Sequence, residues 1–76
     1  MNAARRKAIN ALFSQVEQLL SEVESIRDEE QEYYDNMPES FQGGEKGETA
    51  QAAIDNLETA ISDLETVRDS LEEAGQ

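Results

Sequence analysis

The amino-acid sequence predicts an all-α protein, an antiparallel two-helix hairpin with heptad-like apolar stripes that assembles into a helical bundle by homo-oligomerisation. Two observations lead to this fold class. Apolar residues recur with heptad spacing on both sides of a central segment, positions 33–49. That segment holds the only proline and three of the four glycines. The connection is therefore short and rich in turn residues, which is typical of antiparallel neighbours in helical proteins. The 76 residues form a single domain.

The first predicted helix covers about residues 2–36, and Asn2 is suited to cap its amino terminus. Its apolar side chains fall on three heptad positions, so the stripe is wider than the seam of a two-stranded coiled coil. The residues expected in the core or an oligomer interface are Ile9, Leu12, Phe13, Val16, Leu19, Leu20, Val23 and Ile26. Because each helix of a hairpin has only one neighbour, a stripe this wide predicts homo-oligomerisation.

Two charged residues, Arg27 and Glu30, interrupt the first stripe. They are three residues apart on one helical face, so we expect them to form an ion pair. Such a pair can be structural and fix the register of neighbouring helices. Alternatively, the arginine can face a ligand, and the sequence leaves both interpretations open.

The predicted bend covers about residues 37–47. Pro38 ends the first helix, because the residue before a proline avoids the α region. The following residues, Pro38–Phe41, are suited to one short helical turn. Gly43 and Gly44 are then expected to let the chain reverse, because glycine accepts backbone conformations that other residues avoid.

The second predicted helix covers about residues 48–74 and repeats a seven-residue unit: AAIDNLE, TAISDLE and TVRDSLE. Its residues expected in the core or an oligomer interface are Ile54, Leu57, Ile61, Leu64, Val67 and Leu71. Arg68 interrupts one row of this stripe, as Arg27 does in the first helix. In an antiparallel hairpin Arg68 should lie alongside Glu17, and Gly75 should end the helix.

The composition excludes several classes of function. The chain has no cysteine for a disulfide or a thiolate metal site. It also has no histidine, which is the commonest general base and transition-metal ligand. An EF-hand register that starts at Asp28 fails, because Tyr33 stands where the calcium loop needs glycine. We therefore expect no enzymatic activity, no cofactor and no bound metal.

The formal net charge is −12, from 18 acidic and 6 basic residues. Such a surface repels nucleic acid and anionic membranes, whereas basic protein partners are compatible with it. Three cations near the amino terminus, Arg5, Arg6 and Lys7, form what we call the basic cluster. In the hairpin this cluster either lies beside Glu72 and Glu73 or forms a tip that binds a partner.

No apolar run approaches the length needed to cross a bilayer. The basic amino terminus is not followed by the apolar stretch of a signal peptide. The expected location is therefore cytoplasmic.

The bend carries more recognition side chains than a simple connection requires. The candidate ligand-binding residues, which combine aromatic faces, an amide and cations, are Arg27, Tyr33, Tyr34, Asn36, Phe41, Lys46 and Arg68. This combination suits a nucleotide-like or peptide-like ligand. Aromatic residues at the end of a hairpin can equally cap its core. Gly43, Gly44 and Gly47 surround Lys46 but lack the spacing of a P-loop. They either form an ordinary turn or expose backbone N–H groups to an anion.

Positions 27–48 read RDEEQEYYDNMPESFQGGEKGE, and an acidic heptad helix follows. This combination, with its core DEEQE-x-x-DNMPES, resembles a widespread group of small acidic helical proteins of phages and prophage-bearing bacteria. The resemblance covers the bend and the second helix. The group has no assigned activity, so the resemblance implies no catalytic or binding residues. It implies a phage-type accessory protein in the cytoplasm of an infected or lysogenic host cell.

Small, acidic, non-enzymatic phage proteins often antagonise host defence, some by mimicking nucleic acid and others as helical oligomers that sequester nucleotide immune signals. By this analogy we expect an anti-defence protein that binds a ligand or host factor, with sequestration of a nucleotide-type signal as the specific hypothesis. Two alternatives stay open. One is an acidic inhibitor or nucleic-acid mimic of a basic host protein, and the other is a structural helical adaptor without a ligand.

Overall fold

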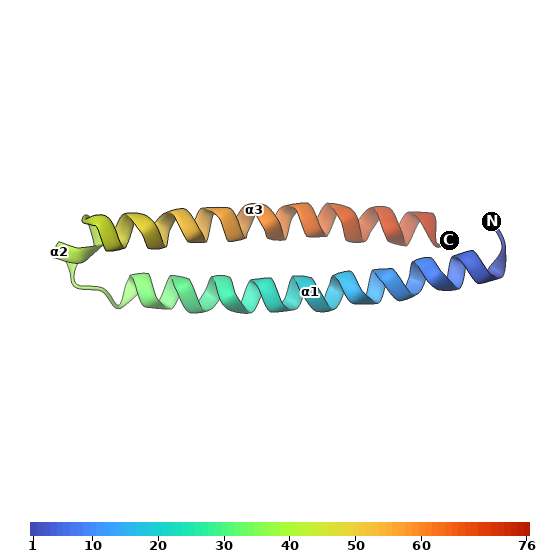
Figure 1. Cartoon of the computed structure of the whole chain (residues 1–76), viewed down its shortest axis with the longest axis horizontal. Coiled ribbons are helices and arrows are strands. Elements are labelled where there is room, and N and C mark those ends of the chain that lie inside the picture. The colour runs from blue at the N-terminus through green and yellow to red at the C-terminus, as the bar shows by residue number, and fades with distance from the viewer.

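The computed structural model describes all 76 residues and shows the all-α antiparallel hairpin that the sequence predicts. Helix α1 spans Ala3–Asp35, helix α2 is a single turn at Glu39–Gln42, and helix α3 spans Glu45–Ala74. The two long helices lie side by side, and both chain ends lie opposite the bend (Figure 1). The backbone extends over 59 × 14 × 12 Å. Neither long helix contains a stretch apolar and long enough to cross a membrane.

Local interactions fix the ends of the first two helices. Asn2 caps α1 as predicted, because its Oδ1 accepts a 2.7 Å hydrogen bond from the backbone N–H of Arg5. Pro38 directly precedes α2, and its carbonyl accepts hydrogen bonds from the backbone N–H groups of Phe41 and Gln42. The predicted short turn after the proline is therefore confirmed.

The side chain of Gln42 ties α2 to the end of α1. Its Nε2 donates a 3.0 Å hydrogen bond to the carbonyl of Tyr34, in a part-buried position. Carbonyls in the last turn of a helix lack partners inside that helix, so an external donor is valuable there. This contact fixes the direction in which the bend leaves α1.

The chain does not reverse through glycine conformational freedom, so the prediction for Gly43 and Gly44 was wrong in this respect. No glycine has a positive φ; the two values are −85° and −100°, which other residues also adopt. The glycine that the bend requires is Gly47, in the first turn of α3. A Cβ atom there would lie 2.6 Å from the Cα atom of Gln42 and still closer to its carbonyl group. The missing side chain lets α3 pass directly against α2.

The core is one layer of side chains between α1 and α3. The buried apolar side chains are Leu20, Ala50, Ile54 and Ile61. The half-buried residues of the predicted stripes are Ile9, Phe13, Val16, Val23, Leu57, Leu64 and Leu71. Only a few side chains are fully enclosed, because each helix has a neighbour on one side only.

One of the three heptad rows predicted for the first helix is exposed in the hairpin. Leu12, Leu19, Ile26 and Tyr33, which we call the exposed row, are 46% to 53% exposed. The two rows that face α3 are covered, and the third lies outside this contact. In α3, Val67 is also 45% exposed. The width of the stripe therefore exceeds what a single hairpin buries.

Candidate functional site

The candidate site lies at the bend, where the three helices meet. Two open hollows of about 390 Å³ each adjoin one another there and share Tyr33 and Lys46 in their walls. The wall of the first hollow is formed by Glu30, Tyr33, Glu45, Lys46, Thr49 and Ala50. The wall of the second hollow is formed by Tyr33, Asn36, Met37, Pro38, Phe41 and Lys46.

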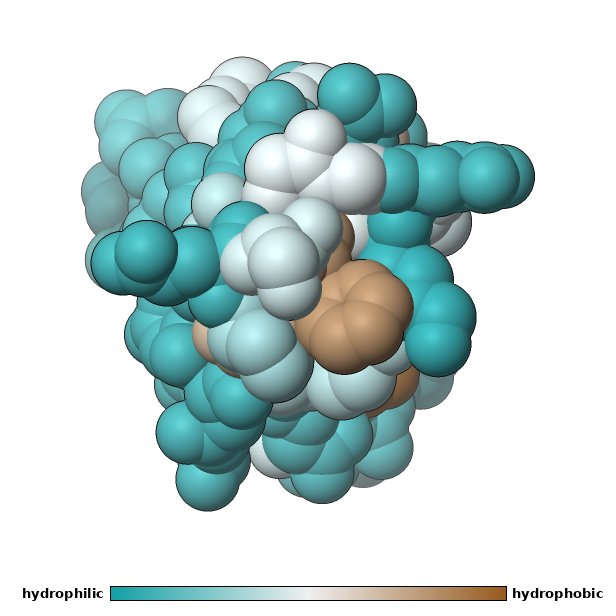
Figure 2. Space-filling view, turned by 90° about the vertical axis from the view of Figure 1, so that its left-hand side faces the viewer, coloured by the Kyte–Doolittle hydropathy of each residue, from teal (hydrophilic) through white to brown (hydrophobic).

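The end surface of the bend combines an apolar area with a positive charge. Seen end-on, a compact hydrophobic area is surrounded by hydrophilic side chains (Figure 2). Tyr33 and Phe41 are both 52% exposed. The Nζ atom of Lys46 lies 5.8 Å from the centre of the Phe41 ring, within the range of a cation–π interaction. Exposed aromatic faces and an ammonium group therefore share one surface.

The side chains of this surface come from all three helices and the residue that caps α1. Tyr33 stands in the last turn of α1, and Asn36 is the residue that caps its carboxyl end. Phe41 belongs to the single turn α2, and Lys46 to the first turn of α3. Because Gly47 allows α3 to approach α2 closely, the lysine is brought beside the phenylalanine ring.

The structure gathers part of the predicted candidate set. The four candidates that line the hollows are Tyr33, Asn36, Phe41 and Lys46. Tyr34 lines neither hollow, and its side chain is half-buried. Its position in the row that faces α3 is that of a residue covering the end of the core.

The two remaining candidates, Arg27 and Arg68, line neither hollow. The Nε atom of Arg27 donates to the Oδ1 atom of Asp28 at 2.8 Å, and the predicted pair with Glu30 was therefore wrong. The arginine reaches out of the helix interface towards an exposed carboxylate, whereas Glu30 lies in the wall of the first hollow. Arg68 forms the equivalent pair with Asp69 at 3.1 Å.

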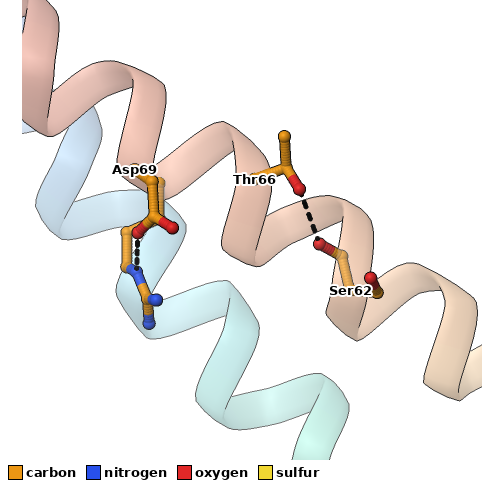
Figure 3. Close-up of polar contacts among 4 residues, drawn as sticks. Ser62, Thr66 and Asp69 are labelled. Atoms are coloured by element: carbon orange, nitrogen blue, oxygen red, sulfur yellow. Dashed lines mark hydrogen bonds and ion pairs between the residues drawn. The ribbon is translucent and has the colours of Figure 1, made fainter.

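The charges that act on Arg68 include one from the opposite long helix. The Oδ1 atom of Asp69 accepts a hydrogen bond of 3.1 Å from the Nε atom of Arg68 (Figure 3). This hydrogen bond is the main reason that the pKa of Arg68 is raised above its ordinary value. The negative charges of Glu65 and of Glu17, the latter on α1, raise this pKa further. Arg68 therefore lies near Glu17, as the antiparallel arrangement predicts.

The basic cluster at the start of α1 is exposed and forms no ion pair. Of the two interpretations of this cluster, pairing with Glu72 and Glu73 was wrong, whereas a tip that binds a partner stays a prediction. The reason for the missing pairing is the relative length of the helices, because α1 projects beyond the end of α3 (Figure 1). Gly75 already lies against Ile9, so the basic cluster has no opposite turn of α3.

Sequence reasoning missed three residues in the first turns of α3, namely Glu45, Thr49 and Ala50. It also treated Glu30 as an ion-pair partner and not as a wall of the hollow. These residues become identifiable once the register between the helices is known. Together, Glu30 and Glu45 outweigh the single positive charge of Lys46 in the first hollow.

Comparisons of the chain with protein-family models, with curated proteins and with solved structures gave no match. The geometry and chemistry of the bend are therefore the basis on which a function can be assigned.

Proposed function

We propose that this protein binds a small ligand at its bend without transforming it, and that the ligand is an anion with an aromatic ring, of the nucleotide class. The observation that carries the proposal is the grouping of Tyr33, Phe41 and Lys46 around two adjoining open hollows. Exposed aromatic faces suit a nucleobase, and an ammonium group suits a phosphate. The amide of Asn36 adds both a hydrogen-bond donor and an acceptor for a base edge.

The chemistry of the walls supports binding rather than catalysis. They contain carboxylates, one lysine and neutral groups, and the chain has neither histidine nor cysteine to serve as base or thiol nucleophile. The resemblance of the bend to small phage proteins adds the biological setting. The protein would sequester a nucleotide-type immune signal in the host cytoplasm and so antagonise host defence.

Isothermal titration calorimetry against linear nucleotides, cyclic dinucleotides and ADP-ribose-type compounds tests this proposal. We expect saturable binding of at least one compound, and a roughly tenfold or larger loss of affinity in Phe41→Ala and Lys46→Gln. Arg68→Gln is the matched control, because it also removes one cation but lies outside both hollows. The absence of saturable heat with all compounds, or an equal loss in the control, would overturn the proposal.

A second candidate, an acidic inhibitor or nucleic-acid mimic, is favoured by the net charge of −12 on a rod whose backbone is 59 Å long. In that case a basic host protein is the partner, and its affinity should fall steeply with added salt. Lys46→Gln should then leave binding unchanged or strengthen it, because it removes a positive charge. The same variant therefore separates the two functions by the direction of its effect.

A further inference from the structure

The exposed row has the geometry of a second helix-packing seam. Leu12, Leu19, Ile26 and Tyr33 follow one another at intervals of seven residues along α1. At a rise of ~1.5 Å per residue, the row extends over about 32 Å. An apolar row with a seven-residue period is the pattern that brings two helices together in a coiled coil.

Helix α3 extends this apolar face. Lys46, Ala53, Ala60 and Val67 are also seven residues apart, and Lys46 lines the same hollow as Tyr33. Two heptad rows that meet at one hollow continue along the same side of an antiparallel hairpin. The alanines are small enough to let another helix approach closely. The face therefore suits an occupant that is itself a long helix.

The charges beside the exposed row are distributed unequally along α1. Its first turns carry the basic cluster, whereas its last turns carry Glu29, Glu30 and Glu32, which we call the acidic end. Leu19 lies at the midpoint of Ala3–Asp35. The apolar row is thus centred on the helix, with opposite charges at its two ends.

We propose that the exposed row binds the exposed row of a second copy of this chain, antiparallel, about a two-fold axis at Leu19. In this register Leu19 meets its own equivalent, Leu12 meets Ile26, and Arg5 meets Tyr33. The basic cluster of each copy then lies beside the acidic end of the other. A parallel pairing would place like charges together at both ends, so the charges select the antiparallel arrangement.

This pairing also completes the ligand site, a step that rests on the proposed function. In a single copy, Glu30 and Glu45 oppose the charge of Lys46, which disfavours an anion in the first hollow. Pairing places Arg5 of the second copy beside Tyr33 of the first copy. Tyr33 lines both hollows. A guanidinium group adds charge and bidentate donors for a phosphate. Each dimer then has two equivalent ligand sites, each built from both copies.

Disulfide cross-linking tests the arrangement without any ligand, because the chain has no cysteine of its own. After mild oxidation, we expect Leu19→Cys to form covalent dimers by itself. Leu12→Cys and Ile26→Cys should form covalent dimers efficiently only when the two variants are mixed. Ser21→Cys, which is exposed and lies off the row, is the control and should remain monomeric. Failure of Leu19→Cys to cross-link, or self-linking of the other two row variants, would overturn the antiparallel pairing.

The locked Leu19→Cys dimer then separates the role of Arg5 in the ligand site from its role in assembly. Within this dimer, Arg5→Gln should weaken the binding of the nucleotide identified by calorimetry about tenfold. Unchanged affinity would refute the composite site while leaving the dimer intact. Efficient cross-linking without binding of any nucleotide would support the dimer and refute the proposed function.

Discussion

Single residues of the bend act through contacts that their type alone does not reveal. Gly47 matters because its missing Cβ atom leaves room for the backbone of Gln42. Gly43 has the same residue type but open space around it, and its φ of −85° suits any residue. The two glycines therefore have opposite expected tolerance to substitution, although they are only four positions apart.

Gly47→Ala should destabilise the hairpin by about 1–3 kcal/mol, because the added carbon forces the backbones of α2 and α3 apart. Gly43→Ala should instead stabilise it by roughly 0.4–1 kcal/mol, since it restricts the unfolded chain without a clash. Urea denaturation followed by circular dichroism measures both free energies of unfolding. A Gly47→Ala variant as stable as Gly43→Ala would refute the close approach.

In each long helix, only the rows of side chains that face the other long helix are covered. Local signals predicted both ends of α1 well, because Asn2 and Pro38 act within one turn of their own position. The start of the second long helix, predicted at about residue 48, lies earlier, at Glu45. Local signals did not predict the partner of Arg27, since its choice of Asp28 depends on which way the side chain leaves the interface. Nor did they identify the wall of the first hollow, which requires the register between helices.

Arg27 interrupts one of the two rows of α1 that face α3. Its side chain is 28% exposed and follows Leu20 in a row that is otherwise apolar. Arg27→Leu should raise the free energy of unfolding by about 1 kcal/mol, because apolar area replaces a partly desolvated charge and Asp28 stays hydrated. Arg27→Gln, which removes the charge but adds little apolar area, should not be stabilising. Thermal denaturation of both variants measures the difference, and a loss of stability in Arg27→Leu would contradict this account.

The whole molecule is a thin rod with a narrow core and an uncovered apolar row on one side. The sequence predicted both the hairpin and a stripe too wide for one neighbour. It did not reveal which row would remain exposed. The exposed row has no charged residue between Leu12 and Tyr33, whereas Arg27 and Glu30 interrupt the two rows that face α3. The antiparallel fold makes that choice by directing two rows towards α3.

If the exposed row forms a dimer interface, thermal stability must depend on protein concentration by mass action. We expect the melting temperature of the native protein to rise with concentration. Leu19→Glu should abolish this dependence and lower the melting temperature, because it places carboxylates at the centre of the interface. Ser21→Glu adds the same charge at an exposed position outside the row and should retain the dependence. A concentration-independent native protein would contradict dimerisation.

We expect the bend also to determine the order in which the parts of the hairpin form. Contacts beside it close the shortest loops and cost the least chain entropy, whereas contacts near the chain ends close the longest. Folding should therefore start at the bend and proceed along both long helices towards the termini. Native-state amide hydrogen exchange should reveal the resulting gradient, with stronger protection around Ile54 than around Leu71. Protection that is uniform along α3 would indicate that the rod opens as one unit.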